Sequence, residues 1–283
     1  MKASAVSKRL RVYALSVGLT ASLFTFLAAC APALERQLIF WPNRAEKETP
    51  AAYGADYDVL ELQSEDGTEL VAWSIPTTQD APWLLFFHGN NTNISRMLNY
   101  PMWLRELTGF NLLMAEYRGF YKSGGVPSEA GLYQDARTYY DYLQNLGVPA
   151  DDILVYGFSL GTGVAAQLAF EKNIGALILH APFTSVHDTA RTLYNKHIPE
   201  TLIQNKFASI DKIAAVDAPL LVMHPMEDET IPFDQGAAIY EAAAEPKQFL
   251  EVPGKHSGLM DSDKGEKRFA PVTEQLINFL LDE

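Results

Sequence analysis

Short runs of apolar or alternating residues recur between residues 58 and 252 and predict β-strands. The first two runs are separated by a short polar connection that is typical of a hairpin. Later runs are separated by helix-length segments with apolar residues at a spacing of about 3.6. This order predicts an α/β fold with a mostly parallel, eight-stranded sheet flanked by helices. The expected strands are Asp58–Gln63, Glu69–Ile75, Trp83–Phe87, Asn111–Ala115, Ile153–Tyr156, Ala176–His180, Leu220–His224 and Gln248–Val252.

The chain divides into three predicted parts. Residues 1–29 combine a basic start with an apolar run from Val12 to Ala29, a pattern typical of a secretory signal peptide. Residues 30–53 contain three prolines that oppose helix formation, so we expect a tether that leads into the domain. Residues 54–283 are the predicted catalytic domain, which is long enough to bury one sizeable core.

The apolar run ends in Leu27-Ala28-Ala29-Cys30, which resembles the bacterial lipobox, and Cys30 is the only cysteine of the chain. A lone cysteine cannot form an internal disulfide, so its position favours lipidation. This predicts a lipid-anchored protein of the bacterial envelope, with the Ala31-Pro32 sequence that follows suggesting the periplasmic side of the outer membrane. The alternative is an uncleaved signal anchor, because 18 apolar residues are near the lower limit for spanning a bilayer.

Charge excludes several kinds of partner. The formal net charge is −13, and removal of residues 1–29 with their four basic residues leaves 18 Lys and Arg against 35 acidic residues, a net charge of −17. Nucleic acid is therefore not an expected partner. Electrostatic adhesion to anionic lipid is not expected either, so membrane attachment is predicted to come from the N-terminal lipid alone.

The sharpest motif is Gly157-Phe158-Ser159-Leu160-Gly161, which follows one predicted strand and precedes a helical run. This context fits a nucleophile elbow, in which a serine on a strained strand-to-helix turn projects its hydroxyl and the flanking glycines allow close backbone approach. Chance occurrence in a glycine-rich turn is the alternative for the motif alone. Ser159 is the predicted nucleophile.

The order of triad residues in this kind of fold is Ser, then Asp or Glu, then His. The acid is expected after the next-to-last strand, where Glu227, Asp228 and Glu229 stand together; Asp228 is the candidate and Glu227 the fallback. A solvated acidic loop is the alternative for such a charge run. The base is expected after the last strand, and His256 is the only histidine beyond His224.

An oxyanion hole needs two backbone donors, of which one is expected from Leu160, after the nucleophile. The second is expected from the loop after the third strand, and we assign it to the N–H of Asn90. His88, in the same loop, precedes Ser159 in the chain, whereas the catalytic histidine of this fold follows the serine, so we assign His88 a structural role. The other histidines, His180, His187, His197 and His224, lack metal-ligand spacing and are also interpreted as structural, so no metal or cofactor is implied.

Further stretches resemble the short-lidded α/β-hydrolase group that includes Bem46-like proteins, α/β-hydrolase-domain depalmitoylases and serine aminopeptidase-like hydrolases. The resemblance covers roughly residues 55 to 283. The sequence departs from this group at Glu116, where Asp is usual, at Tyr121, where Gly is common, and at Pro225, where the strand usually ends His-Gly. The stretches that carry the resemblance are His88-Gly89-Asn90, Tyr117-Arg118-Gly119, Pro127-Ser128-Glu129, Gly157 to Gly163, Ala181 to Ser185 and Ile231-Pro232-Phe233.

The resemblance implies hydrolysis of an ester, thioester or amide, and a small lid is expected between Phe183 and Asp217. A carboxylic ester or thioester of a lipid-like acyl group is the favoured substrate, with Phe158, Phe183 and Leu160 either lining its groove or belonging to the core. A peptidase or amidase is the second hypothesis, with Glu116 and the Glu227–Glu229 cluster as an acidic subsite. An inactive hydrolase fold that serves as a binding module is the third.

Overall fold

The computed structural model describes residues 35–194, 203–261 and 267–281. The chain divides into two units between Ile39 and Phe40, and of the first unit only residues 35–39, which are helical, are described. The second unit begins at Phe40, so it includes residues 40–53, the later part of the predicted tether and entry segment.

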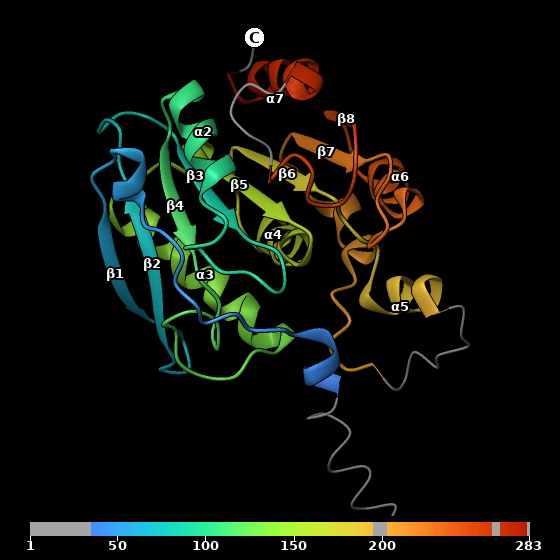
Figure 1. The fold of residues 1–283 in the computed structure, drawn as a ribbon, viewed down its shortest axis with the longest axis horizontal. Coiled ribbons are helices and arrows are strands. Elements are labelled where there is room, and N and C mark those ends of the chain that lie inside the picture. Colours follow the sequence, from blue (N-terminus) through green and yellow to red (C-terminus); the bar gives the residue numbers. More distant parts are fainter. Residues whose placement is uncertain (1–34, 195–202, 262–266, 282–283) are drawn as a thin grey trace, which may run out of the picture. The chain divides into compact units, whose positions relative to one another are not determined.

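The domain is built on one eight-stranded sheet with the strand order β1-β2-β4-β3-β5-β6-β7-β8 (Figure 1). The strands β1 and β2 pair antiparallel, β2 also pairs antiparallel with β4, and all remaining pairs are parallel. The predicted fold class and all eight strands are confirmed. The bounds are β1 Asp58–Gln63, β2 Glu69–Ile75, β3 Trp83–Phe87, β4 Asn111–Ala115, β5 Ile153–Phe158, β6 Ala176–His180, β7 Leu220–Pro225 and β8 Lys247–Val252.

Helices follow the strands in the order that the spacing of apolar residues predicts. The α-helices are α2 Asn99–Thr108, α3 Glu129–Asn145, α4 Leu160–Glu171, α5 Val186–Tyr194, α6 Phe233–Ala242 and α7 Ala270–Leu281. Short 3₁₀ turns are η1 Pro50–Tyr53, η2 Ala150–Asp152, η4 Ser209–Asp211, η5 Ile213–Ala215 and η6 Lys267–Phe269. Ser128 caps α3, because its hydroxyl oxygen accepts a hydrogen bond from the Gly131 N–H at 3.1 Å.

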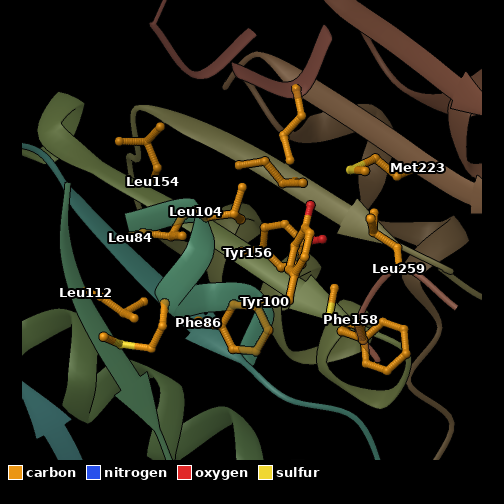
Figure 2. Packing of buried hydrophobic residues seen from close by; sticks show 14 of the residues in the cluster. Leu84, Phe86, Tyr100, Leu104, Leu112, Leu154, Tyr156, Phe158, Met223 and Leu259 are labelled. Atoms are coloured by element: carbon orange, nitrogen blue, oxygen red, sulfur yellow. The ribbon is translucent and has the colours of Figure 1, made fainter. Parts of the chain in front are cut away.

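Successive side chains of β5 point to opposite faces of the sheet, and each face has its own buried layer. Leu154, Tyr156 and Phe158 join one buried cluster with side chains of α2 and α7, which contact each other. Figure 2 shows Tyr100 of α2 beside Tyr156 in this cluster, with ring centroids 6.1 Å apart. The opposite face is covered by α4, which contacts β5 and α3. Because β3 to β7 are buried along their whole length, the central strands form a rigid platform for the loops at their carboxyl ends.

Candidate active site

Ser159 lies between β5 and α4 with φ 52° and ψ −118°, a left-handed backbone conformation that a non-glycine residue adopts rarely. The glycines on either side permit this turn. A Cβ atom on Gly157 would collide with the carbonyl oxygen of Gly161, and one on Gly161 would collide with the carbonyl oxygen of Phe87. The geometry is therefore that of a nucleophile elbow, with the serine at the carboxyl end of a central strand.

His256 lies between Ser159 and Asp228, within hydrogen-bond distance of both. The Nε2 atom of His256 is 2.9 Å from Oγ of Ser159, and Nδ1 of His256 is 2.7 Å from Oδ2 of Asp228. The three residues follow β5, β8 and β7, and the carboxyl ends of parallel strands share one edge of the sheet. When Nδ1–H donates to Asp228, Nε2 is left as the acceptor for the serine hydroxyl.

The carboxylate of Asp228 is held by backbone groups as well as by the histidine. Its side chain has no exposed surface, and its Oδ1 atom accepts hydrogen bonds from the N–H groups of Thr230 and Ile231, both at 2.8 Å. Burial by itself would raise the pKa of Asp228, but the His256 hydrogen bond and charge, followed by the backbone donors, outweigh it and lower the pKa below its usual value. Glu227, the fallback, is exposed.

His256 is only partly enclosed. Its side chain keeps 16% of its surface exposed, and its ring lies 5.2 Å from that of Phe158 at a tilt of 35°. Ser159 is 8% exposed. Because His256 is partly exposed, a substrate can reach the Ser159 hydroxyl from the side of the loops that follow the strands.

Two loops meet at the serine where an oxyanion would form. Leu160 is the first residue of α4, so its N–H is one of those that a helix leaves without an intrahelical acceptor. The loop after β3 lies directly against the elbow, because a Cβ atom on Gly89 would be 3.3 Å from Cβ of Ser159. Asn90, the next residue, has its side-chain Oδ1 bound by the N–H of Trp41 at 2.9 Å.

A family model described as serine aminopeptidase, S33, matches residues 79–212. The α/β-hydrolase domain-containing protein 17B of Xenopus laevis is 34% identical over 232 residues, which are 81% of this chain and 79% of the frog protein. The chain belongs to the α/β-hydrolase family. An uncharacterised protein of Mycobacterium tuberculosis is 33% identical over 224 residues, 78% of this chain and 79% of its own length.

Solved structures show the same fold. A Pyrococcus furiosus esterase, Pf2001, superposes with a TM-score of 0.69 at 19% identity, covering 86% of this chain and 97% of its own. Est1E of Butyrivibrio proteoclasticus, solved with ferulic acid, superposes with a TM-score of 0.64 at 20% identity, covering 79% of this chain and 98% of its own. Family and esterase-like fold together identify this α/β-hydrolase as a hydrolytic enzyme.

Glu116 does not offer a carboxylate to a substrate amine, as the peptidase hypothesis required. Its side chain is fully buried, with Oε1 2.7 Å from Nε2 of His88 and Oε2 accepting the N–H of Ile94 at 3.1 Å. Of the remaining acidic cluster, Glu229 is paired with Lys255 at 2.8 Å. Sequence reasoning missed the His88 contact because 28 residues separate the pair.

Two further histidines of this α/β-hydrolase are buried near the site. His180, at the end of β6, has Nδ1 2.9 Å from the Tyr156 hydroxyl, and burial, with smaller repulsion from His256 and His224, lowers the pKa of His180 to about 3. Burial also lowers the pKa of His224, whose Nε2 atom is 3.0 Å from the Ile231 carbonyl oxygen. His187 lies on α5, and His197 is outside the described residues. Within the described ranges, no group of three or more His, Cys, Asp or Glu residues is placed to hold a metal.

The apolar side chains around the elbow belong to the core. Phe158 is 3% exposed and packs between His180 and His256, while Phe183 is 4% exposed and its ring lies 6.5 Å from that of Phe207. Leu160 is buried as well. None of these three residues presents an open groove to a substrate, so the core interpretation holds.

The predicted lid and lipid anchor fall partly or wholly on residues that the structure does not describe. Helix α5 and the turns η4 and η5 lie between Phe183 and Asp217, but residues 195–202 are outside the described part. Residues 1–29 and Cys30 are also outside it. No helix among the described residues is long and apolar enough to cross a bilayer.

Proposed function

We propose that this hydrolase cleaves carboxylic ester or thioester bonds of acyl substrates through a covalent acyl-enzyme, with Ser159 as nucleophile, His256 as general base and Asp228 as the group that orients the histidine. The observation that carries the proposal is the continuous series of hydrogen bonds from Asp228 through His256 to the Ser159 hydroxyl. The strained backbone of Ser159, at a strand-to-helix turn, supports the same assignment.

The chemistry follows from the positions of these atoms. Nε2 of His256 takes the hydroxyl proton as Oγ of Ser159 attacks the substrate carbonyl carbon, and the N–H groups of Leu160 and Asn90 bind the oxyanion. Collapse of the tetrahedral intermediate expels the alcohol or thiol, which receives the proton from His256. Water then attacks the acyl-enzyme by the same route and releases the acid. Each oxyanion donor contributes on the order of 3 kcal/mol to transition-state stabilisation.

A peptidase or amidase activity is the second candidate, and the description of the matching family model favours it. The burial of Glu116 weakens it, since of the residues proposed for the acidic subsite Glu116 is enclosed and Glu229 is paired with Lys255. Parallel assays with p-nitrophenyl esters, acyl thioesters and aminoacyl arylamides separate the candidates. Higher kcat/KM for the arylamides than for both acyl series would favour the peptidase.

We further propose that Cys30 carries a lipid that anchors the enzyme in a bacterial envelope, with the catalytic domain on the periplasmic side. This proposal is supported by the sequence around Cys30 and by the acidic character of the mature chain, which disfavours electrostatic adhesion to anionic lipid. Mass analysis of the mature N-terminus tests it. An unmodified Cys30, or a retained segment 1–29, would overturn the anchor.

The decisive experiment is labelling of the full-length protein by a fluorophosphonate probe. Wild type is compared with Ser159→Ala, His256→Ala and Asp228→Ala, and circular dichroism establishes that each variant folds. We expect labelling of wild type and of Glu227→Gln, no labelling of Ser159→Ala, and strongly slowed labelling of the other two. A folded wild type that does not react would leave the binding module as the better explanation.

A further inference from the structure

His88, the residue that follows β3, has both ring nitrogens against oxygen atoms in a fully buried position. Nδ1 is 2.7 Å from the carbonyl oxygen of Gly89, and Nε2 is 2.7 Å from Oε1 of Glu116. A carbonyl oxygen can only accept a hydrogen bond, so Nδ1 must carry a proton and donate it to Gly89. The ring is thereby fixed to the backbone of its own loop.

Glu116, the residue that follows β4, holds the other side of that ring. Its Oε1 atom also accepts the N–H of Tyr117 at 3.0 Å, and its Oε2 atom accepts the N–H of Ile94 at 3.1 Å. A single proton lies between Nε2 of His88 and Oε1 of Glu116. The Glu116 carboxyl group therefore links the end of β4 and the loop after β3 to the imidazole of His88. The Tyr117 hydroxyl also donates a hydrogen bond to the His88 carbonyl oxygen at 2.8 Å.

The Gly89 carbonyl belongs to the same peptide unit as the Asn90 N–H. This peptide is trans, since the single cis bond in the described chain is Glu245–Pro246. In a trans peptide the C=O and N–H groups point in opposite directions, so fixing the Gly89 oxygen on His88 directs the Asn90 N–H away from the ring. Gly89 lies against Ser159, and the Asn90 side chain is held separately by Trp41.

We propose that His88 and Glu116 form a positioning pair that sets the orientation of the Gly89–Asn90 peptide, and through it the second oxyanion donor. The inference rests on the proposed acyl-transfer function. It gives His88 a role beyond burial in the core and gives Glu116 a reason to be buried among donors. Neither residue touches the substrate; both act through one peptide plane.

The kinetic test compares Glu116→Ala and Glu116→Gln with Asp135→Asn. Asp135 is another fully buried carboxylate that binds a backbone N–H, that of Arg118 at 2.9 Å, but it has no contact with the Gly89 peptide, so it is the matched control. We expect Glu116→Ala to lower kcat for esters about a hundredfold with KM within threefold, and to weaken binding of a trifluoromethyl ketone by a similar factor. Glu116→Gln can still bond to His88, but its amide NH2 must face the N–H of Tyr117 or of Ile94, so we expect a loss of kcat smaller than that of Glu116→Ala.

Unchanged kcat and ketone affinity in folded Glu116→Ala would overturn the positioning pair, and so would an equal loss of kcat in Asp135→Asn. If Glu116→Ala does not fold, His88→Asn takes its place in the same comparison, and its unchanged kcat and ketone affinity would overturn the pair. A second measurement does not depend on activity. In the Ser159→Ala background, ¹⁵N NMR of labelled histidines should show a protonated Nδ1 for His88, and an unprotonated Nδ1 would refute the pair. Failure of wild type to react with any acyl substrate would instead count against the proposed function.

Discussion

Nε2 of His256 lies 2.9 Å from Oγ of Ser159, although 97 positions separate the two residues in the sequence. The contact forms because β5 and β8 are strands of one sheet whose carboxyl ends lie at the same edge. Asp228 completes the series from the end of β7, which lies between β6 and β8 in the same sheet. The loops that carry the three side chains are therefore set by the register of buried strands and not by local sequence.

Replacement of Asp228 by Asn should lower kcat on the order of 10⁴-fold without unfolding the protein, because the amide favours the wrong histidine tautomer. Glu227→Gln is the control, since Glu227 is exposed and one position away. Steady-state ester hydrolysis measures both variants. Equal losses in the two would mean that the loop, and not the Asp228 carboxylate, matters.

Gly161→Ala should destabilise the fold by about 3 kcal/mol or more, because the new methyl group would collide with the backbone carbonyl of Phe87, which cannot move without disturbing the sheet. Gly124→Ala is the control: its Cβ atom would meet atoms of Glu69 at 3.5 Å or more, which are ordinary contacts. Urea unfolding of both variants gives the comparison. Similar midpoints would contradict the close approach at the elbow.

Arg118→Met should cost about 3–5 kcal/mol of stability, because it leaves the Asp135 carboxylate buried without its partner. Burial raises the pKa of Asp135, and the hydrogen bonds and charge of Arg118 oppose that rise only in part. Adding Asp135→Asn to Arg118→Met should therefore restore part of the loss. A double-mutant cycle by urea unfolding measures the coupling, and simple additivity would show that the pair does not interact.

His180 should make the protein less stable in acid. Its pKa is lowered from an ordinary 6.5 to about 3, so between these values the unfolded chain binds a proton that the folded protein does not. The free energy of unfolding then decreases as pH falls through this window, by at most about 1.4 kcal/mol per pH unit from this group. His180→Asn keeps an acceptor for Tyr156 and should show a flatter pH dependence. Parallel stability curves for the variant and wild type would refute the assignment.

Much of this architecture could be predicted from sequence because the signals are local. Each strand from β3 to β7 is an almost continuous apolar run. The elbow of Ser159 can be identified from two glycines at fixed spacing around the serine. The candidate acid and base could be located because strand ends and their order limit the choices. Which of three adjacent carboxylates faces His256 was decided only by the loop, where the N–H groups of Thr230 and Ile231 fix Asp228.

Other features left no local signal. The residues after Phe40 have no strand or helix pattern that would predict their contacts, yet the carbonyl oxygen of Asn43 accepts hydrogen bonds from Asn93 and Tyr121, which lie far along the chain. Tyr121 adopts φ 40°, where the related group commonly has glycine. Its hydroxyl donates a hydrogen bond to Glu46 at 2.5 Å, a contact that a glycine could not make and whose partner lies 75 positions away.

The hydrogen bond from Trp41 to Asn90 has a practical consequence. A shortened protein that begins at residue 54 would lose this contact and the rest of the segment that starts at Phe40, and its kinetics would describe a loosened site. Assays of the enzyme therefore need a chain that starts at or before Phe40.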